Sequence, residues 1–165
     1  MSAEPDPPSD APGGGMLSDP QSLADAVGRA MYSRDRASQA LGMSLVAIGP
    51  GKATMTMRVR PDMCNGHGLC HGGLIFTLAD STFAFACNSW NVNAVAQGCS
   101  IDFLAAAHEG NLLTATGEKR QQGSRTGLYD ITVTNEGNET IALFRGRSYR
   151  LQGEVLSGLE PRAAR

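Results

Sequence analysis

NGHGLCHGGLIFTLADSTFAFAC, residues 65–87, is the stretch of this 165-residue chain on which the prediction of its fold depends. Its first part is polar and glycine-rich, whereas residues 74–87 are almost wholly apolar. Apolar side chains would lie on every face of a helix over residues 72–88, so we expect that helix to be buried. It is too short to cross a bilayer, which takes about 20 apolar residues. The stretch therefore predicts one central core helix preceded by a polar loop.

The same stretch contains groups that could take part in a reaction. Asp80 is the one ionisable residue in the apolar run, and a buried carboxylate is costly unless it is paired, hydrogen-bonded or used. Gly72 and Gly73 allow backbone N–H groups at the helix start to approach a ligand closely. The positive helix terminus favours negative charge there. A carboxylate and an anion-stabilising N–H are two of the parts that acyl transfer requires.

The spacing of these groups decides how they could act together. Gly72 and Asp80 are eight residues apart. On one helix that separation is about 12 Å, whereas a reacting carbonyl must lie within about 3 Å of each group. We therefore expect them to meet from two copies of the chain, in an isologous homodimer that pairs two such helices antiparallel and forms two equivalent sites.

Composition excludes several classes of protein. The net charge of -2, the absence of a basic stripe and an aromatic content of 5% argue against a nucleic-acid-binding protein. The four cysteines, at positions 64, 70, 87 and 99, show no disulfide framework, and the acidic, proline-rich start is unlike a signal peptide. We expect a cytoplasmic protein that does not act at a membrane.

The start of the chain has two expected parts. Residues 1–22 are rich in Pro, Gly, Asp and Ser and are predicted to be a disordered tail. Ser22 is the predicted N-cap of a helix over residues 23–41, and Gly42 is expected to end it.

The remaining segments alternate between apolar and polar residues. They predict strands over residues 43–48, 53–60, 92–104, 111–120, 127–135 and 140–151. Gly98 is a candidate β-bulge. Residues 153–165 are expected to be a polar C-terminal tail. Short turns between the late strands imply an antiparallel sheet, which we expect to curl around the single long helix in an α+β fold.

These residues resemble one known family, the hot-dog-fold thioesterases of phenylacetate breakdown (the PaaI type). The resemblance covers residues 23–152 and is most specific in the central block. The matching segments are Asn65-Gly66-His67, Cys70-His71-Gly72-Gly73, Leu78-Ala79-Asp80-Ser81, Cys99-Ser100-Ile101-Asp102-Phe103-Leu104, Gly127-Leu128-Tyr129-Asp130-Ile131 and Ala142-Leu143-Phe144-Arg145-Gly146.

The resemblance implies a hot-dog fold, a homodimer, and pairing of dimers into a tetramer. It also implies hydrolysis of phenylacetyl-CoA and hydroxyphenylacetyl-CoA thioesters without a metal or other cofactor. Asp80 would be the catalytic carboxylate, and Gly72 would supply the N–H that polarises the thioester carbonyl. Asn65 would help to position the attacking water. The expected substrate-binding residues are His71, Gly73, Ser81, Gly123 and Arg125, with the segment around Gly123 close to the CoA phosphates.

One position departs from the family. Close relatives can carry Asn where this chain has Arg34, at the end of the first predicted helix. Because that helix can lie near the acyl pocket, benzoyl-CoA and medium-chain acyl-CoA remain alternative substrates to the arylacetyl-CoA thioesters.

Several alternatives stay open for individual residues. Asp80 could act as a general base or as a nucleophile. Asn65 could simply form a turn, and Ser81 could hydrogen-bond to its own helix instead of supporting Asp80. A zinc site at Cys64, His67, Cys70 and His71 is disfavoured because its four ligands would crowd into eight residues. A nucleophilic pair of Cys70 and His71 is disfavoured because the side chains of sequence neighbours seldom face each other. A non-catalytic acyl-CoA-binding module is the second function class, whereas the hydratase motif of other hot-dog proteins is absent.

Overall fold

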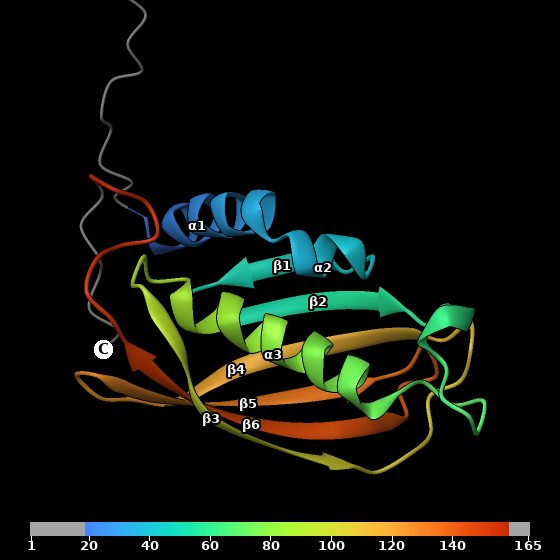
Figure 1. The fold of residues 1–165 in the computed structure, drawn as a ribbon. Helices are drawn as coiled ribbons and strands as arrows, with labels where there is room; N and C mark the ends of the chain where they lie inside the picture. Colours follow the sequence, from blue (N-terminus) through green and yellow to red (C-terminus); the bar gives the residue numbers. More distant parts are fainter. Residues whose placement is uncertain (1–18, 159–165) are drawn as a thin grey trace, which may run out of the picture.

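The computed structural model describes residues 19–158 and contains one sheet with a long helix across it (Figure 1). The elements in chain order are α1 (Pro20–Arg34), α2 (Arg36–Ala40), β1 (Ser44–Gly49), β2 (Lys52–Arg58), the 3-10 turn η1 (Pro61–Met63), α3 (Gly72–Asn88), β3 (Ala94–Phe103), β4 (Leu112–Gln122), β5 (Thr126–Thr134) and β6 (Thr140–Arg150).

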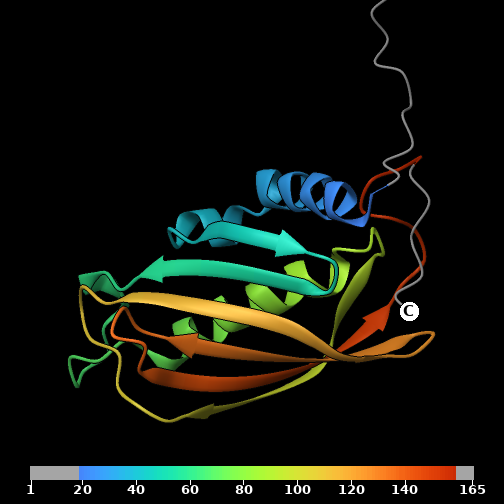
Figure 2. The same ribbon diagram turned by 180° about the vertical axis from the view of Figure 1, so that it is seen from behind.

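The six strands form an antiparallel sheet in the order β1-β2-β4-β5-β6-β3. The sheet curls around α3, while α1 and α2 lie beside β1 (Figure 1). Seen from behind, the sheet stands in front of α3, so the helix occupies one face only (Figure 2). The α+β arrangement expected from the sequence is confirmed, with α3 at the predicted residues 72–88.

Apolar periodicity explains how the sheet holds the helix. In β2 and β5 every second side chain is buried, because successive residues of a strand point to opposite faces. On α3 the buried Phe83 ring packs edge-on against Tyr129, with centroids 5.6 Å apart, and lies 6.0 Å from the ring of Phe144. A Cβ on Gly146 would lie only 2.8 Å from the Phe83 ring, so a glycine is needed at the point where β6 meets α3.

The first helix differs from the prediction at both ends. Asp19, and not Ser22, is the N-cap of α1, since an Asp19 carboxylate oxygen accepts from the N–H of Ser22 at 3.0 Å. Pro20 fills the first helical position, where no N–H is needed. The predicted tail over residues 1–22 is therefore wrong for residues 19–22, and its part over residues 1–18 lies outside the described residues.

The predicted single helix over residues 23–41 is broken at Asp35. The Asp35 backbone leaves the helical region (φ -83, ψ 80), and its side chain accepts from the N–H of Ser38 at 3.0 Å, which makes it the N-cap of α2. Gly42, with φ +68, follows the end of α2, as its left-handed conformation allows.

Two later details concern β3 and the C-terminal segment. The register of β3 against β6 shifts between Ala96 and Gly98, which confirms the predicted bulge. Leu156, which follows β6, exchanges two hydrogen bonds of 3.1 and 2.8 Å with Asn91. This part of the expected C-terminal tail is therefore attached to the domain. Residues 159–165 lie outside the described residues. None of the helices over residues 19–158 is long and apolar enough to span a membrane.

The contact at Gly146 gives a stability prediction. Gly146→Ala should lower the free energy of unfolding by about 1–3 kcal/mol, because the added methyl displaces the buried Phe83 ring. Gly66→Ala is the control, since a Cβ there meets nothing within 4 Å. Urea denaturation followed by circular dichroism measures both, and equal midpoints for the two variants would contradict the packing described.

Candidate functional site

The start of α3 presents a free backbone donor. His71 is the N-cap, and its Nδ1 accepts from the N–H of Gly73 at 3.0 Å. Among the described residues, the N–H of Gly72 has no hydrogen-bond acceptor. The first N–H groups of a helix carry its partial positive charge. Of the two glycines, Gly72 is therefore the one whose N–H is available to an anionic oxygen.

The loop before α3 is held by the side chain of Asn65. Its Oδ1 accepts from the N–H groups of His67 at 2.9 Å and Leu69 at 3.3 Å. Within one chain, Asn65 thus acts as the turn former that was one of the two predicted alternatives. The N–H of His71 donates to the carbonyl of Met63 at 2.8 Å, which joins this loop to the helix start. A role for Asn65 toward substrate stays a prediction.

Asp80 lies two turns further along α3 and is partly buried. The thiol of Cys99, on β3, donates to Asp80 Oδ1 over 3.9 Å. Burial raises the pKa of the Asp80 carboxyl, and the Cys99 hydrogen bond lowers it. A carboxyl whose pKa is raised toward neutrality is better suited to accept a proton from water than an exposed one.

Among the residues that the structure describes, Ser81 forms neither of its two predicted hydrogen bonds. Its Oγ lies 3.1 Å from the Oγ of Ser38, which is buried and donates to a carboxylate oxygen of Asp35 at 2.6 Å. Ser81 therefore connects α3 to the start of α2, and it supports the helix that carries Asp80 without touching that carboxylate through this bond.

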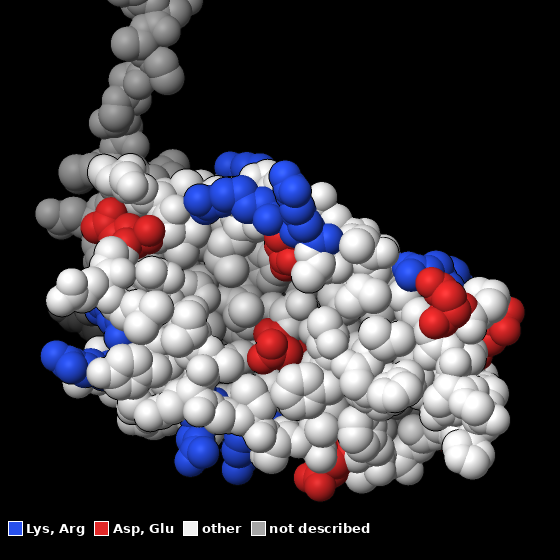
Figure 3. Space-filling view, viewed as in Figure 1, with Lys and Arg blue, Asp and Glu red and all other residues white. Residues whose placement is uncertain are grey.

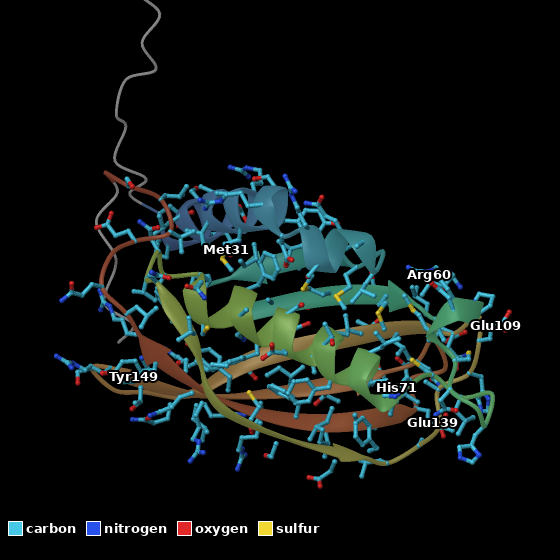
Figure 4. The ribbon with its side chains drawn as sticks, viewed as in Figure 1. Met31, Arg60, His71, Glu109, Glu139 and Tyr149 are labelled. Carbon is cyan, nitrogen blue, oxygen red and sulfur yellow. The ribbon has the colours of Figure 1, made fainter. Side chains whose placement is uncertain are left out.

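The structure keeps Gly72 and Asp80 apart. Both lie on the one continuous helix, eight residues or about 12 Å from each other. In Figure 4 His71 marks one end of α3, while Tyr149 lies toward the opposite end of the molecule. One chain thus offers the donor and the carboxylate at separate places, as the spacing in the sequence predicted.

The surface beside these groups is apolar. The outer edge of β3 has no neighbouring strand among the described residues. Val95, Phe103 and Leu104 are 45%, 51% and 58% exposed on or next to this strand, and the Phe103 ring lies directly against Gly72. The same side of the molecule is hollowed near α3, with Lys and Arg gathered over its α1 border (Figure 3).

A cavity of about 290 Å³ lies at the C-terminal end of α3. Gly123 and Arg125, on the β4–β5 hairpin, line it together with Arg150. The Arg125 guanidinium donates to the Tyr149 hydroxyl over 3.4 Å. The buried indole N–H of Trp90, which also lines the cavity, has no hydrogen-bond partner among the described residues. Gly123 and Arg125 are thus together, but far from the start of α3.

The cysteines of the loop lie close together, because Cys64 and Cys70 face each other in a β-bridge, but the histidines do not complete a metal site with them. Over residues 19–158, no group of three or more His, Cys, Asp or Glu side chains could hold a metal ion. Burial raises the pKa of Cys70 to about 11, so its thiol is a poor nucleophile at neutral pH. The sequence did not predict the Cys99–Asp80 contact or the unpartnered indole N–H of Trp90 among the described residues. The available signal was that Cys99 lies in an apolar run and Trp90 lies beside one.

Comparison with known proteins identifies the family. A model of the thioesterase superfamily matches residues 67–142. The acyl-coenzyme A thioesterase PaaI of Escherichia coli (strain K12) is 48% identical over 126 residues, which cover 76% of this chain and 90% of that protein. Acyl-coenzyme A thioesterase 13 of Homo sapiens is 31% identical over 124 residues, or 73% of this chain and 88% of that protein.

Solved structures agree. The E. coli PaaI protein from the phenylacetic acid degradation operon matches with a TM-score of 0.81 and 46% identity, over 82% of this chain and 99% of that one. A Streptococcus mutans protein bound to acetyl CoA matches with a TM-score of 0.65 and 28% identity, over 68% of this chain and 90% of that one. The hot-dog fold expected from the sequence is confirmed.

The buried thiols allow a labelling prediction. At pH 8, Cys70 in the folded protein should react with iodoacetamide about 100-fold more slowly than in the urea-unfolded chain, because its pKa is raised from 9.0 to about 11. Cys87, with a pKa raised to about 12, should react more slowly still. Peptide mass spectrometry measures both, and rapid labelling of folded Cys70 would restore the Cys70–His71 nucleophile as a candidate.

Proposed function

The chain belongs to the thioesterase superfamily and is an acyl-CoA thioesterase, and we propose that it hydrolyses phenylacetyl-CoA and hydroxyphenylacetyl-CoA to the free acid and CoA. The observation that carries this proposal is the pair of groups on α3: a free N–H on Gly72 at the helix start and a partly buried carboxylate on Asp80. The choice of arylacetyl groups is supported by the similar E. coli protein PaaI, which is encoded in the phenylacetic acid degradation operon.

The two groups have complementary tasks in thioester hydrolysis. The Gly72 N–H donates to the thioester carbonyl oxygen and stabilises the negative charge that develops there. As a general base, Asp80 removes a proton from water while the water oxygen attacks the carbonyl carbon; collapse of the tetrahedral intermediate expels the CoA thiolate, which takes up the proton. As a nucleophile, Asp80 would form a mixed anhydride that water then cleaves. Both routes need the ionised carboxylate.

The site requires two chains. A single helix holds the donor and the carboxylate about 12 Å apart, so each site takes Gly72 from one chain and Asp80 from the other. The exposed apolar residues along the free edge of β3 support an isologous homodimer formed on this side of the molecule. Pairing of dimers into a tetramer and a cytoplasmic location stay predictions from the sequence and the family.

The two ends of the CoA molecule can be assigned to different parts of the chain. Cys87, at the cavity beside Arg125, lies seven residues after Asp80, or about 10 Å along the helix. The flexible pantetheine arm can bridge such a distance between the thioester and the phosphates. Arg125 and Arg150 supply positive charge for phosphate at the cavity, and Gly123 lets the hairpin backbone approach it.

The acyl end lies nearer to α1. Arg34 lines a hollow between α1 and α3 that includes Ala84, one helical turn after Asp80. Its guanidinium donates to the carbonyls of Ala30 at 2.9 Å and Val155 at 3.4 Å. Arg34 is thus held at the rim, where its replacement of the family's Asn would alter the pocket for the acyl group. Benzoyl and medium-chain acyl-CoA are the alternative substrates.

Replacement of the carboxylate tests the activity. Asp80→Asn should lower thiol release from phenylacetyl-CoA and hydroxyphenylacetyl-CoA by several orders of magnitude, because the amide can neither accept a proton from water nor attack the carbonyl. Release is followed with a chromogenic thiol reagent, beside benzoyl and medium-chain acyl-CoA. Full activity of Asp80→Asn would exclude the mechanism, whereas an inactive wild type that still binds CoA would favour the binding module.

Subunit mixing tests the shared site. Gly72→Pro removes the N–H at the first helical position, where proline is tolerated, and the extended backbone of His71 (φ -62, ψ 128) suits a following proline. Alone, it should lower kcat by about 100- to 1000-fold. Gly72→Ala is the matched control, because it adds the same Cβ against Phe103 but keeps the donor.

Coexpression of Gly72→Pro with Asp80→Asn should restore activity. Each heterodimer contains one doubly altered site and one intact site, so the heterodimers should have roughly half of the wild-type rate. Each variant carries a different affinity tag, the heterodimers are isolated through both tags, and thiol release is assayed. Activity no higher than that of the separate variants would show that one chain supplies both groups.

A further inference from the structure

We propose that Cys99 is a positioning residue for the reaction, and that its thiol holds Asp80 Oδ1 so that Oδ2 faces the substrate. The inference rests on the proposed function, because it takes Asp80 as the reacting carboxylate. Its basis is the 3.9 Å contact between Cys99 Sγ and Asp80 Oδ1, which joins β3 to the middle of α3. No other side chain among the described residues donates a hydrogen bond to this carboxylate.

The backbone places Cys99 on the correct face of β3. Cys99 pairs with Gly146 of β6, and the Phe83 ring of α3 covers that glycine. Because residues paired directly across antiparallel strands have their side chains on the same face, Cys99 points to the side of the sheet on which the helix lies. Ser100 points to the other face, and the bulge between Ala96 and Gly98 sets this alternation, since a one-residue change in register exchanges the two faces.

The charges around Asp80 come from three elements. On α3, Cys87 is close enough for the Asp80 charge to raise its pKa. On β3, Cys99 is the hydrogen-bond donor, and on β6 the guanidinium of Arg147 lies beside the bulge and lowers the pKa of the Cys99 thiol. Asp35, at the start of α2, reaches α3 only through a chain of two serine hydroxyls.

The contact has two consequences for the carboxylate. Burial and the Asp80 charge raise the pKa of Cys99 above its ordinary value, so the thiol stays protonated at neutral pH and remains a donor. A donor to the ionised form of a carboxyl lowers its pKa and opposes the effect of burial. The same bond restricts rotation of the carboxylate. Cys99 therefore increases the ionised fraction of Asp80 and directs its second oxygen.

Titration of Asp80 tests this without any substrate. The side-chain carboxyl carbons are followed by ¹³C NMR from pH 3 to 9, and the Asp80 signal is identified by its loss in Asp80→Asn. Cys99→Ala should raise the titration midpoint of Asp80 by about half a unit to one unit, and Cys99→Ser should return it toward the wild-type value. Ser100→Ala, on the opposite face of the same strand, is the matched control and should leave the midpoint unchanged.

The pH dependence of thiol release completes the test. Because the reaction needs ionised Asp80, the acidic limb of kcat/KM should move to higher pH in Cys99→Ala, with a rate about three- to tenfold lower below the midpoint, and Cys99→Ser should restore it. An unchanged NMR midpoint in a folded Cys99→Ala would overturn the inference whether or not the protein hydrolyses thioesters. A shifted midpoint together with an active Asp80→Asn would instead refute the proposed mechanism and, with it, any catalytic role for Cys99.

Discussion

The structure depends on the rigid position of one buried helix in a curled sheet. The rings of Phe83, Tyr129 and Phe144 hold the middle of α3 against β5 and β6. At its C-terminal end, Asn88 exchanges two hydrogen bonds of 2.9 Å with the backbone of Ala94, the first residue of β3. The helix therefore has no freedom to bring its own start closer to its own middle, and this fixed separation is the physical reason why the proposed site needs a second chain.

The proposed function places three tasks along α3, where the local environment changes along the helix. The start has the free N–H of Gly72 and a flanking glycine loop, which suit a developing anion. The middle is partly desolvated, which suits a carboxylate that takes up a proton. The end adjoins a cavity with two arginines, which suit phosphate. One apolar helix thus presents three chemistries in sequence order, about 10 Å apart.

The sequence was sufficient for the elements that follow from a repeating pattern. Alternating residues predicted the strands, and the apolar run predicted α3 at its observed ends. Asp35 was missed because helical periodicity continues on both sides of it, while the capping bond from its carboxylate to Ser38 is a local competitor that periodicity does not weigh. The Asp80–Cys99 contact depends on the register of β3 against β6, and no pattern within either segment encodes that register.

The edge of β3 also affects the behaviour of a single chain. This strand carries exposed apolar side chains at an open sheet edge, and Asp102 is its only charged residue. Natural proteins usually protect such an edge with lysine, proline or a covering segment, because it can recruit any other strand. If the proposed homodimer forms on this edge, a newly synthesised chain is prone to aggregation until it pairs, so the rate of pairing would limit how much of the protein stays soluble.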